Sequence, residues 1–324
     1  YKSKAYKRND TATIEVDTLE FSRLILEGKN IRFEELPCKD QELSFEILYS
    51  KLKESVQIET FNRDTLKTLN LYDNVNGYNN AGGLLADRNH FPGIDMVKFG
   101  ESISIIQKRV TFENISILDV YEKAIAVFRD YYEYEVIQEA DRKKVEKIPE
   151  AAFREAIANS LIHRVWDVES QIRVLMFDDR IEVVSPGGLP SGITVNEYLA
   201  GKLSALRNRN LANVFYRLGF VEIFGTGIIR IKQLYEESLA KPEFEVSENA
   251  IKVVLPIFEN NFNLSEDEKA IYKVLSKTML KSISEIAPYV PFGKSKTTQL
   301  LKSMGQKGVV IVEGKGRSTK YIKK

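Results

Sequence analysis

Residues 149–163 read Pro-Glu-Ala-Ala-Phe-Arg-Glu-Ala-Ile-Ala-Asn-Ser-Leu-Ile-His, and the rest of the chain is organised around this stretch. Pro149 suits the first position of a helix, where the N–H that proline lacks would have no partner inside the helix. Phe153, Ile157 and Leu161 recur every four residues and therefore share one side of such a helix. The spacing predicts an α-helix whose apolar face packs against a core.

A second stripe on this helix is polar. Glu155, Asn159 and His163 also recur every four residues, so their side chains fall on a common side. Two glycine turns follow: residues 185–189 read Ser-Pro-Gly-Gly-Leu after a predicted strand, and residues 225–227 read Gly-Thr-Gly before a predicted helix. Backbone N–H groups at a helix start bind phosphate, and a carboxylate and an amide one turn apart suit a metal ion and its water. Together these motifs indicate a site for a nucleotide phosphate and its metal.

These motifs resemble, in the same order, the ATP-binding domain of the GHKL group, which includes gyrase and the histidine kinases. The similarity is closer to a divergent branch, labelled RecG-C-terminal-like, that occurs in bacterial transcriptional regulators. The segments that carry the resemblance are 154–164, 177–190, 207–208 and 222–231. It implies a GHKL-like α/β sandwich.

The resemblance also implies roles for single residues. In GHKL enzymes the glutamate of this helix positions the attacking water and the asparagine binds Mg²⁺, which assigns Glu155 and Asn159 here. His163 and Ser185 stand where the group usually has aspartates, the second of which binds the adenine amino group. With ATP or ADP and Mg²⁺ as cofactors, the nucleotide-binding residues implied are Asn159, His163, Gly187, Gly188, Arg207, Gly225, Thr226 and Gly227. Residues 191–210 would form the mobile lid, with an ordinary surface loop as the alternative.

The two missing aspartates leave an alternative open, in which the domain keeps the fold and has lost the nucleotide. Glu155 would then pair with Arg154 or Arg180, Asn159 would bond to backbone, and the glycines would serve only the turns. We expect a regulator rather than an enzyme, with a slow DNA-linked ATPase as the alternative.

From residue 264 onward the chain is basic, while the remainder is acidic. Residues 264–324 contain 13 Lys and Arg against 5 Asp and Glu, whereas the rest of the chain contains 34 against 41. A basic module on an acidic body suggests a nucleic-acid partner for that module.

This basic module has the element order of a winged helix. Ser265 and Glu268 form a capping box before a first helix; helices at 282–287 and 294–305 and strands at 309–313 and 319–322 follow. It resembles winged-helix regulators, whose third helix enters the major groove of DNA while the wing contacts phosphates. The DNA-binding residues implied are Lys294, Lys296, Thr297, Thr298, Gln299 and Lys302 on the exposed side of the third helix, and Lys315, Arg317 and Lys320 on the wing. A protein–protein contact is the alternative use of the module.

Four domains are predicted in all. Residues 1–36 resemble the end of a Schlafen-type AlbA domain, residues 37–148 read as a middle α+β region, residues 149–258 form the GHKL-like domain, and residues 264–324 form the winged helix. Within the middle region we expect helices at 45–55, 63–69 and 117–134 and strands at 94–99 and 103–110. The pair Gly82-Gly83 indicates either a buried strand or a tight turn, and we favour the turn.

We expect a multi-domain α+β protein from these elements, and 29% charged with 43% hydrophobic residues fits a globular chain. The single cysteine, Cys38, excludes an internal disulfide framework, and one cysteine with two histidines argues against structural zinc. No apolar run approaches the length of a membrane span, and no GxxxxGK[ST] phosphate loop of a helicase motor occurs. The resemblance implies a bacterial regulator that binds duplex DNA, and we expect a cytoplasmic homodimer. Because the first residue is Tyr1 and not a methionine, we expect a fragment of a longer protein.

Overall fold

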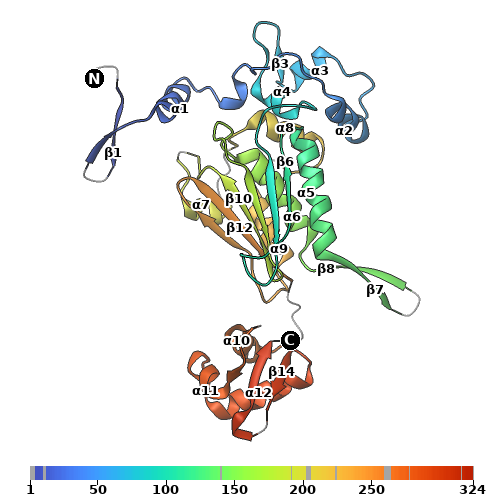
Figure 1. The fold of residues 1–324 in the computed structure, drawn as a ribbon, viewed down its shortest axis with the longest axis vertical. Helices are drawn as coiled ribbons and strands as arrows, with labels where there is room; N and C mark the ends of the chain where they lie inside the picture. The colour runs from blue at the N-terminus through green and yellow to red at the C-terminus, as the bar shows by residue number, and fades with distance from the viewer. Residues whose placement is uncertain are drawn as a thin grey trace. The chain divides into compact units, whose positions relative to one another are not determined.

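The computed structural model, drawn in Figure 1, describes most of the chain. The described residues are 4–9, 12–138, 141–190, 192–201, 206–222, 225–258, 264–276, 278–314 and 316–323. The chain divides into two compact units, residues 1–234 with 242–257 and residues 235–241 with 258–324. The predicted wing residue Lys315 and the side chain of Arg317 lie outside the described residues, as do Ser191 and residues 202–205 of the predicted lid.

A mixed six-stranded sheet forms the centre of the first unit. Its strands, in spatial order, are β11 (Glu243–Val246), β12 (Ala250–Pro256), β10 (Arg180–Pro186), β9 (Ile172–Met176), β5 (Ile94–Phe99) and β6 (Ile106–Phe112). Strands β5 and β9 run parallel, with Ile94 opposite Ile172, and the other neighbouring pairs are antiparallel. Because β5 and β6 come from the predicted middle region, one sheet crosses the boundary that we placed at residue 148.

Alternating side chains decide which face of the sheet is covered. Ile172, Val174 and Met176 of β9 are buried, and Ile181 and Val183 of β10 lie opposite Met176 and Val174 on the same face. The sequence pattern predicts strands at 171–177 and 181–184 that pair as a hairpin, and this prediction is confirmed. Since successive residues of a strand point to opposite faces, this face is the one that meets the helices.

The opposite face of the sheet carries ion pairs. Arg109 on β6 donates two hydrogen bonds to Asp95 on β5, at 3.1 and 2.8 Å, and Lys252 on β12 lies 2.7 Å from Glu245 on β11. Opposite charges on neighbouring strands stabilise the pairing, and charged side chains along an edge strand such as β6 discourage pairing with another chain.

Helix α6 (Glu150–His163) lies at the centre of the helical layer (Figure 1). It contacts α5 (Ile117–Tyr132), α8 (Arg209–Arg217), α9 (Gly227–Leu234) and the strands β10 and β12. The ring of Phe153 stacks on Phe128 of α5 with 4.4 Å between centroids. The predicted apolar face is confirmed. Burial extends around most of the helix, because neighbouring helices and strands cover it on several sides.

The glycine pair of the middle region lies in a short helix, α4 (Asn80–Leu85), so both the strand and the favoured tight turn were wrong. The side chain of Asn79 caps this helix by accepting the N–H of Gly82. A Cβ on Gly82 would lie 2.8 Å from the carbonyl oxygen of Leu71, and one on Gly83 would lie 2.6 Å from the sulfur of Cys38. The two glycines therefore let α4 pack closely against Leu71 and Cys38.

The other helices of the middle region follow the prediction closely, with α2 at Glu46–Val56 and α3 at Arg63–Thr68. A short hairpin follows α3, made of β3 (Tyr72–Asp73) and β4 (Gly77–Tyr78). The helix predicted to reach residue 134 ends at Tyr132, and a hairpin that we did not predict follows it: β7 (Glu133–Gln138) and β8 (Asp141–Glu146). Its many charged residues hide the alternation that normally reveals a strand.

The N-terminal part consists of β1 (Tyr6–Asn9), β2 (Ala12–Glu15), α1 (Thr18–Gly28) and the short 3₁₀ helix η1 (Phe33–Glu35). Arg23 of α1 binds Asp167 through two hydrogen bonds of 2.6 and 3.0 Å. Glu34 of η1 is fully buried and accepts the backbone N–H groups of Asn210 and Leu211 at the start of α8. The assignment of residues 1–36 to an AlbA domain stays a prediction.

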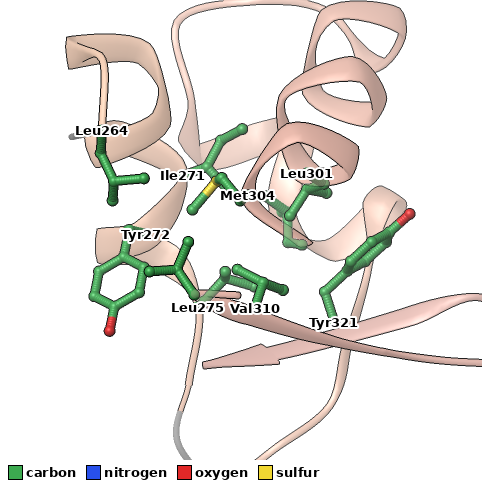
Figure 2. Packing of buried hydrophobic residues seen from close by; sticks show 10 residues of the cluster. Leu264, Ile271, Tyr272, Leu275, Leu301, Met304, Val310 and Tyr321 are labelled. Carbon is green, nitrogen blue, oxygen red and sulfur yellow. The ribbon is translucent and has the colours of Figure 1, made fainter. Parts of the chain in front are cut away.

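The second compact unit has its own core, shown in Figure 2. Its elements are α10 (Glu266–Val274), β13 (Lys281–Ser282), α11 (Ile283–Ile286), η2 (Ala287–Tyr289), α12 (Lys294–Gln306), β14 (Val310–Glu313), η3 (Gly316–Ser318) and β15 (Lys320–Lys323). Ile271, Leu301 and Met304 are fully buried, which joins α10 to α12. The predicted capping box of Ser265 and Glu268 is confirmed.

Two further details differ from the sequence analysis. The sequence pattern predicts a helix from the second glycine turn to about Leu239, whereas α9 ends at Leu234. The strand β11 was missed altogether. Among the described residues, no helix is both long and apolar enough to cross a bilayer.

Candidate nucleotide-binding site

A cavity of about 90 Å³ lies between α6, the turn after β10, and the start of α9. Its lining includes polar groups from α6, the backbone of both predicted glycine turns, and apolar side chains from β12 and from the segment after residue 190. The lining residues are Ala156, Asn159, Ser160, His163, Ser185, Gly187, Gly188, Leu189, Pro190, Ile193, Tyr198, Gly225, Gly227, Ile228, Ile251 and Val253. The structure thus brings together most of the residues that the sequence assigned to a nucleotide.

Glu155 and Asn159 contact each other as their spacing predicts. The Nδ2 group of Asn159 donates to Oε1 of Glu155 at 3.0 Å. On its other side, Oε2 of Glu155 lies 3.7 Å from Nη1 of Arg230, whose Nη2 donates to Glu222 at 2.9 Å. The alternative partners that we considered for Glu155, Arg154 and Arg180, are not the ones it has. Arg230 was missed because only the fold brings α9 against α6.

The charge of Glu155 fixes the orientation of the Asn159 amide. A carboxylate only accepts hydrogen bonds, so the NH₂ group must face Glu155 and the amide oxygen is left for other partners. Burial raises the pKa of the Glu155 carboxyl, while the hydrogen bond from Asn159 and the charge of Arg230 lower it. Asn159 therefore offers the cavity an oxygen suited to a cation, and Glu155 is held between an amide and a guanidinium.

The glycines of both turns are required by the packing. Gly187 has a φ of +103°, and its N–H donates to the carbonyl of Asn249. A Cβ on Gly188 would lie 2.3 Å from the carbonyl oxygen of Glu248. Gly227 lies directly against the site, since its Cβ would be 2.4 Å from Oε1 of Glu155 and 2.6 Å from Nδ2 of Asn159. The first glycine turn thus uses one of its N–H groups to bind the turn between β11 and β12.

Arg207 binds backbone instead of lining the cavity. Its Nη1 donates to the carbonyl of His163 at 2.7 Å, and its Nη2 donates to that of Gly188 at 2.9 Å. The guanidinium therefore ties the end of α6 to the first glycine turn. We predicted a nucleotide contact here; in the structure its two terminal nitrogens donate to carbonyl groups of the fold.

His163 lines the cavity as an uncharged group. Burial and the nearby charge of Arg207 lower its pKa to about 4, so its imidazole is neutral at pH 7. A neutral imidazole can exchange hydrogen bonds with a base or a sugar but does not attract phosphate by charge.

A short helix covers part of the cavity in the segment predicted as a lid. Helix α7 (Val195–Leu199) is capped by Thr194 and Glu197, and Tyr198 and Ile193 lie on the cavity. Nζ of Lys232 on α9 donates to the carbonyl of Leu199 at 2.7 Å, which ties α7 to the helix on the other side of the site.

Several lining residues escaped the sequence analysis, notably Ser160, Tyr198 and Ile228. Ser160 directly follows Asn159 in the sequence. Its carbonyl oxygen accepts a hydrogen bond of 3.2 Å from the hydroxyl of Ser185, which lies 25 positions further along the chain. Local spacing carries no signal for such a contact.

In the second unit, the predicted DNA-binding residues of α12 fall into two groups. Lys294, Lys296, Thr298, Gln299 and Lys302 are exposed, as is Lys320 on β15. Thr297 was expected on the exposed side and is instead fully buried, and its hydroxyl donates to the carbonyl of Gly293 at the helix start. Lys296 lies 2.6 Å from Asp267 and over the ring of Phe292, so part of its charge is used inside the unit.

Comparisons with known proteins identify a family for part of the first unit and a similar solved structure for the whole chain. Residues 169–255 match a family described as "Putative ATP-dependent DNA helicase recG C-terminal". No curated protein matches the chain. Among solved structures, the chain is similar to the DIP2311 protein from Corynebacterium diphtheriae, with a TM-score of 0.58 and 20% identity over 100% of this chain and 70% of that chain. This second likeness concerns the fold alone. Residues 169–255, which include strands β9 to β12 and both glycine turns but not α6, therefore belong to a divergent ATPase-like domain.

Proposed function

We propose that the protein is a DNA-binding transcriptional regulator whose second unit is a winged helix. The observation that carries the proposal is the two-sided character of α12. Leu301 and Met304 are buried in the core of the unit, whereas Lys294, Thr298 and Lys302 are exposed. Helices with this combination of donors and cations enter the major groove, where they contact phosphates and base edges.

The experiment is a titration of fluorescent duplex DNA with the full chain, followed by anisotropy over a series of salt concentrations. Binding should weaken steeply with salt, because phosphate contacts release counterions. Lys302→Ala should lower the affinity and reduce the salt slope by about one unit for a single lost phosphate contact. Lys123→Ala is the matched control, since Lys123 lies on α5 of the other unit and pairs with Asp119.

Absence of any salt-dependent binding would favour a protein–protein role for the second unit. An equal loss in Lys302→Ala and Lys123→Ala would mean that total charge, and not α12, determines the affinity.

We also propose that the ATPase-like domain binds ATP or ADP with Mg²⁺ and hydrolyses ATP slowly or not at all. Binding is supported by the oxygen of Asn159 and the backbone of the two glycine turns at one cavity. Slow hydrolysis is supported by the contacts of Glu155, since a carboxylate between Asn159 and Arg230 is poorly placed to accept a proton from water. The cavity of about 90 Å³ is smaller than the roughly 300–1,000 Å³ of most ligand sites, so α7 would have to move aside.

A further inference from the structure

A second cavity, of about 480 Å³, lies on the other side of Glu155. It is bounded by the outer side of α6, by the loop that follows α8, and by α9. The residues that line it are Ala151, Arg154, Glu155, Gly219, Phe220, Val221, Glu222, Arg230, Gln233 and Leu234. Its volume falls within the roughly 300–1,000 Å³ typical of small-molecule sites, which the nucleotide cavity does not reach.

One wall of this second cavity is a fixed aromatic surface. The ring of Phe220 stacks on Tyr121 with 4.7 Å between centroids and meets Phe215 edge-on at 5.7 Å. Tyr121 and Phe215 are fully buried, so they hold Phe220 in place. Val221 and Leu234 add apolar surface beside it. An apolar ligand group would therefore find a preformed wall.

Two guanidinium groups face the cavity, and they differ in how far their charge is balanced. Arg230 contacts two carboxylates, Glu222 at 2.9 Å and Glu155 at 3.7 Å. These pairs leave little attraction for a further anion. Both acidic side chains of the cavity are thus already engaged by Arg230.

Arg154 has a weaker partner. Nη1 of Arg154 lies 3.6 Å from Glu150, but Arg129 already holds both oxygens of that carboxylate at 2.6 and 2.8 Å. The bond from Arg129 lowers the pKa of Glu150 to about 2, as expected for a carboxylate claimed by a close cation. The guanidinium of Arg154 rests over the ring of Tyr121, 5.5 Å from its centroid, which directs it beside the aromatic wall.

We propose that this second cavity binds a small organic anion, whose charged head pairs with Arg154 and whose apolar body lies against Phe220 and Leu234. A guanidinium with five N–H donors binds carboxylate or phosphate through two parallel hydrogen bonds, and the apolar wall supplies burial. The site is a candidate effector site, and it does not depend on nucleotide binding in the first cavity.

The test is isothermal titration calorimetry of the full chain with three ring compounds that differ in the head group: benzoate, phenyl phosphate and benzylamine. Benzoate, phenyl phosphate or both should bind, and benzylamine should not, because its charge is of the wrong sign for Arg154. The ratio of the two anion affinities distinguishes a carboxylate ligand from a phosphate ligand.

Variants then locate the site. Arg154→Gln should weaken anion binding by about tenfold or more, the expected loss for a charge-assisted hydrogen bond. Arg154→Lys keeps the charge without the fork and should retain part of the affinity. Arg173→Gln, the same change at an exposed position on β9, should leave the affinity unchanged. The unliganded melting temperature of each variant shows whether it is folded.

Three results would overturn the proposal: neither anion binds the unmodified protein, benzylamine binds as tightly as benzoate, or Arg154→Gln binds both anions as well as the unmodified protein does.

Discussion

Asn159 is the residue on which the proposed nucleotide binding would depend most directly, because its amide oxygen is the metal-suited atom of the first cavity. We expect ATP analogues with Mg²⁺ to raise the melting temperature of the protein, since a ligand that binds only the native state stabilises it by mass action. Asn159→Ala should remove this shift. Asn196→Ala, on the exposed side of α7, is the control and should keep it. If millimolar nucleotide leaves the unmodified protein unchanged, the site is vestigial.

Gly227 is a second sensitive position, because the space for a side chain is already filled. A methyl group there would overlap Oε1 of Glu155 and Nδ2 of Asn159. Gly227→Ala should cost about 1–3 kcal/mol of unfolding free energy, the usual cost of overpacking. Gly28→Ala is the matched control: no atom lies within 4 Å of its added methyl, so it should be neutral or slightly stabilising. Urea denaturation of both variants provides the comparison, and equal stabilities would contradict the close contact at Gly227.

At the scale of single residues, the sequence predicts contacts that a helix makes within itself. The bond between Asn159 and Glu155 follows from their spacing of four, and the capping box of Ser265 and Glu268 follows from a spacing of three. The partner of Glu155 does not follow, since Arg230 reaches it only after α9 packs on α6. Arg207 was assigned to the nucleotide by resemblance, and no local pattern shows that its guanidinium binds carbonyl groups.

At the scale of elements, the start of α8 depends on a residue far away in the chain. No side chain of α8 itself caps the helix; Glu34 instead accepts N–H groups from Asn210 and Leu211. Burial raises the pKa of Glu34 to about 7, although these N–H bonds act in the opposite direction. The folded state therefore binds a proton more tightly than the unfolded state does.

The pH dependence follows from this difference. The stability contributed by protonated Glu34 should be fully present below about pH 4.5 and be lost as the pH rises through about 7. For a pKa shift of this size, the free energy of unfolding should change by about 3 kcal/mol. His163 acts in the opposite sense over part of the same range, because its lowered pKa costs stability as the pH falls below about 6.5. The informative quantity is thus the difference in unfolding free energy between the unmodified protein and Glu34→Gln at each pH. If this difference in unfolding free energy is the same at pH 5 and pH 8, the pKa of Glu34 is not raised in the folded protein.

Elements with strong periodicity were predicted well, and elements with weak periodicity were missed. Helices α5 and α6 and the hairpin of β9 with β10 have clear apolar patterns. The hairpin of β7 with β8 is mostly charged, and α4 contains two glycines that disfavour a helix in isolation. Packing against Leu71 and Cys38 makes α4 favourable, and that packing is not visible in the local sequence.

For the whole molecule, two compact units with separate cores predict two unfolding transitions. Met304 is fully buried in the second unit, so Met304→Ala should lower the stability of that unit by about 2–5 kcal/mol and leave the first unchanged. Scanning calorimetry should show one shifted peak and one constant peak. Met279→Ala is the control, since Met279 is exposed and its loss should shift neither peak. A single transition that shifts as a whole would show that the units unfold together.

The parallel pairing of β5 with β9 affects how the chain acquires its fold during synthesis. Strand β5 ends at Phe99 and its partner begins at Ile172, so ribosomes must add the whole crossover before the pair can form. Pairings between segments distant in sequence form slowly, because closing a long loop costs entropy before any contact offsets it. Until then, nascent chains carry β5 with the edge that later meets β9 still open, and the N–H and C=O groups of that edge can pair with other chains. Nascent chains truncated before residue 172 should thus aggregate readily. Chaperones should matter most while residues 100–172 are being translated.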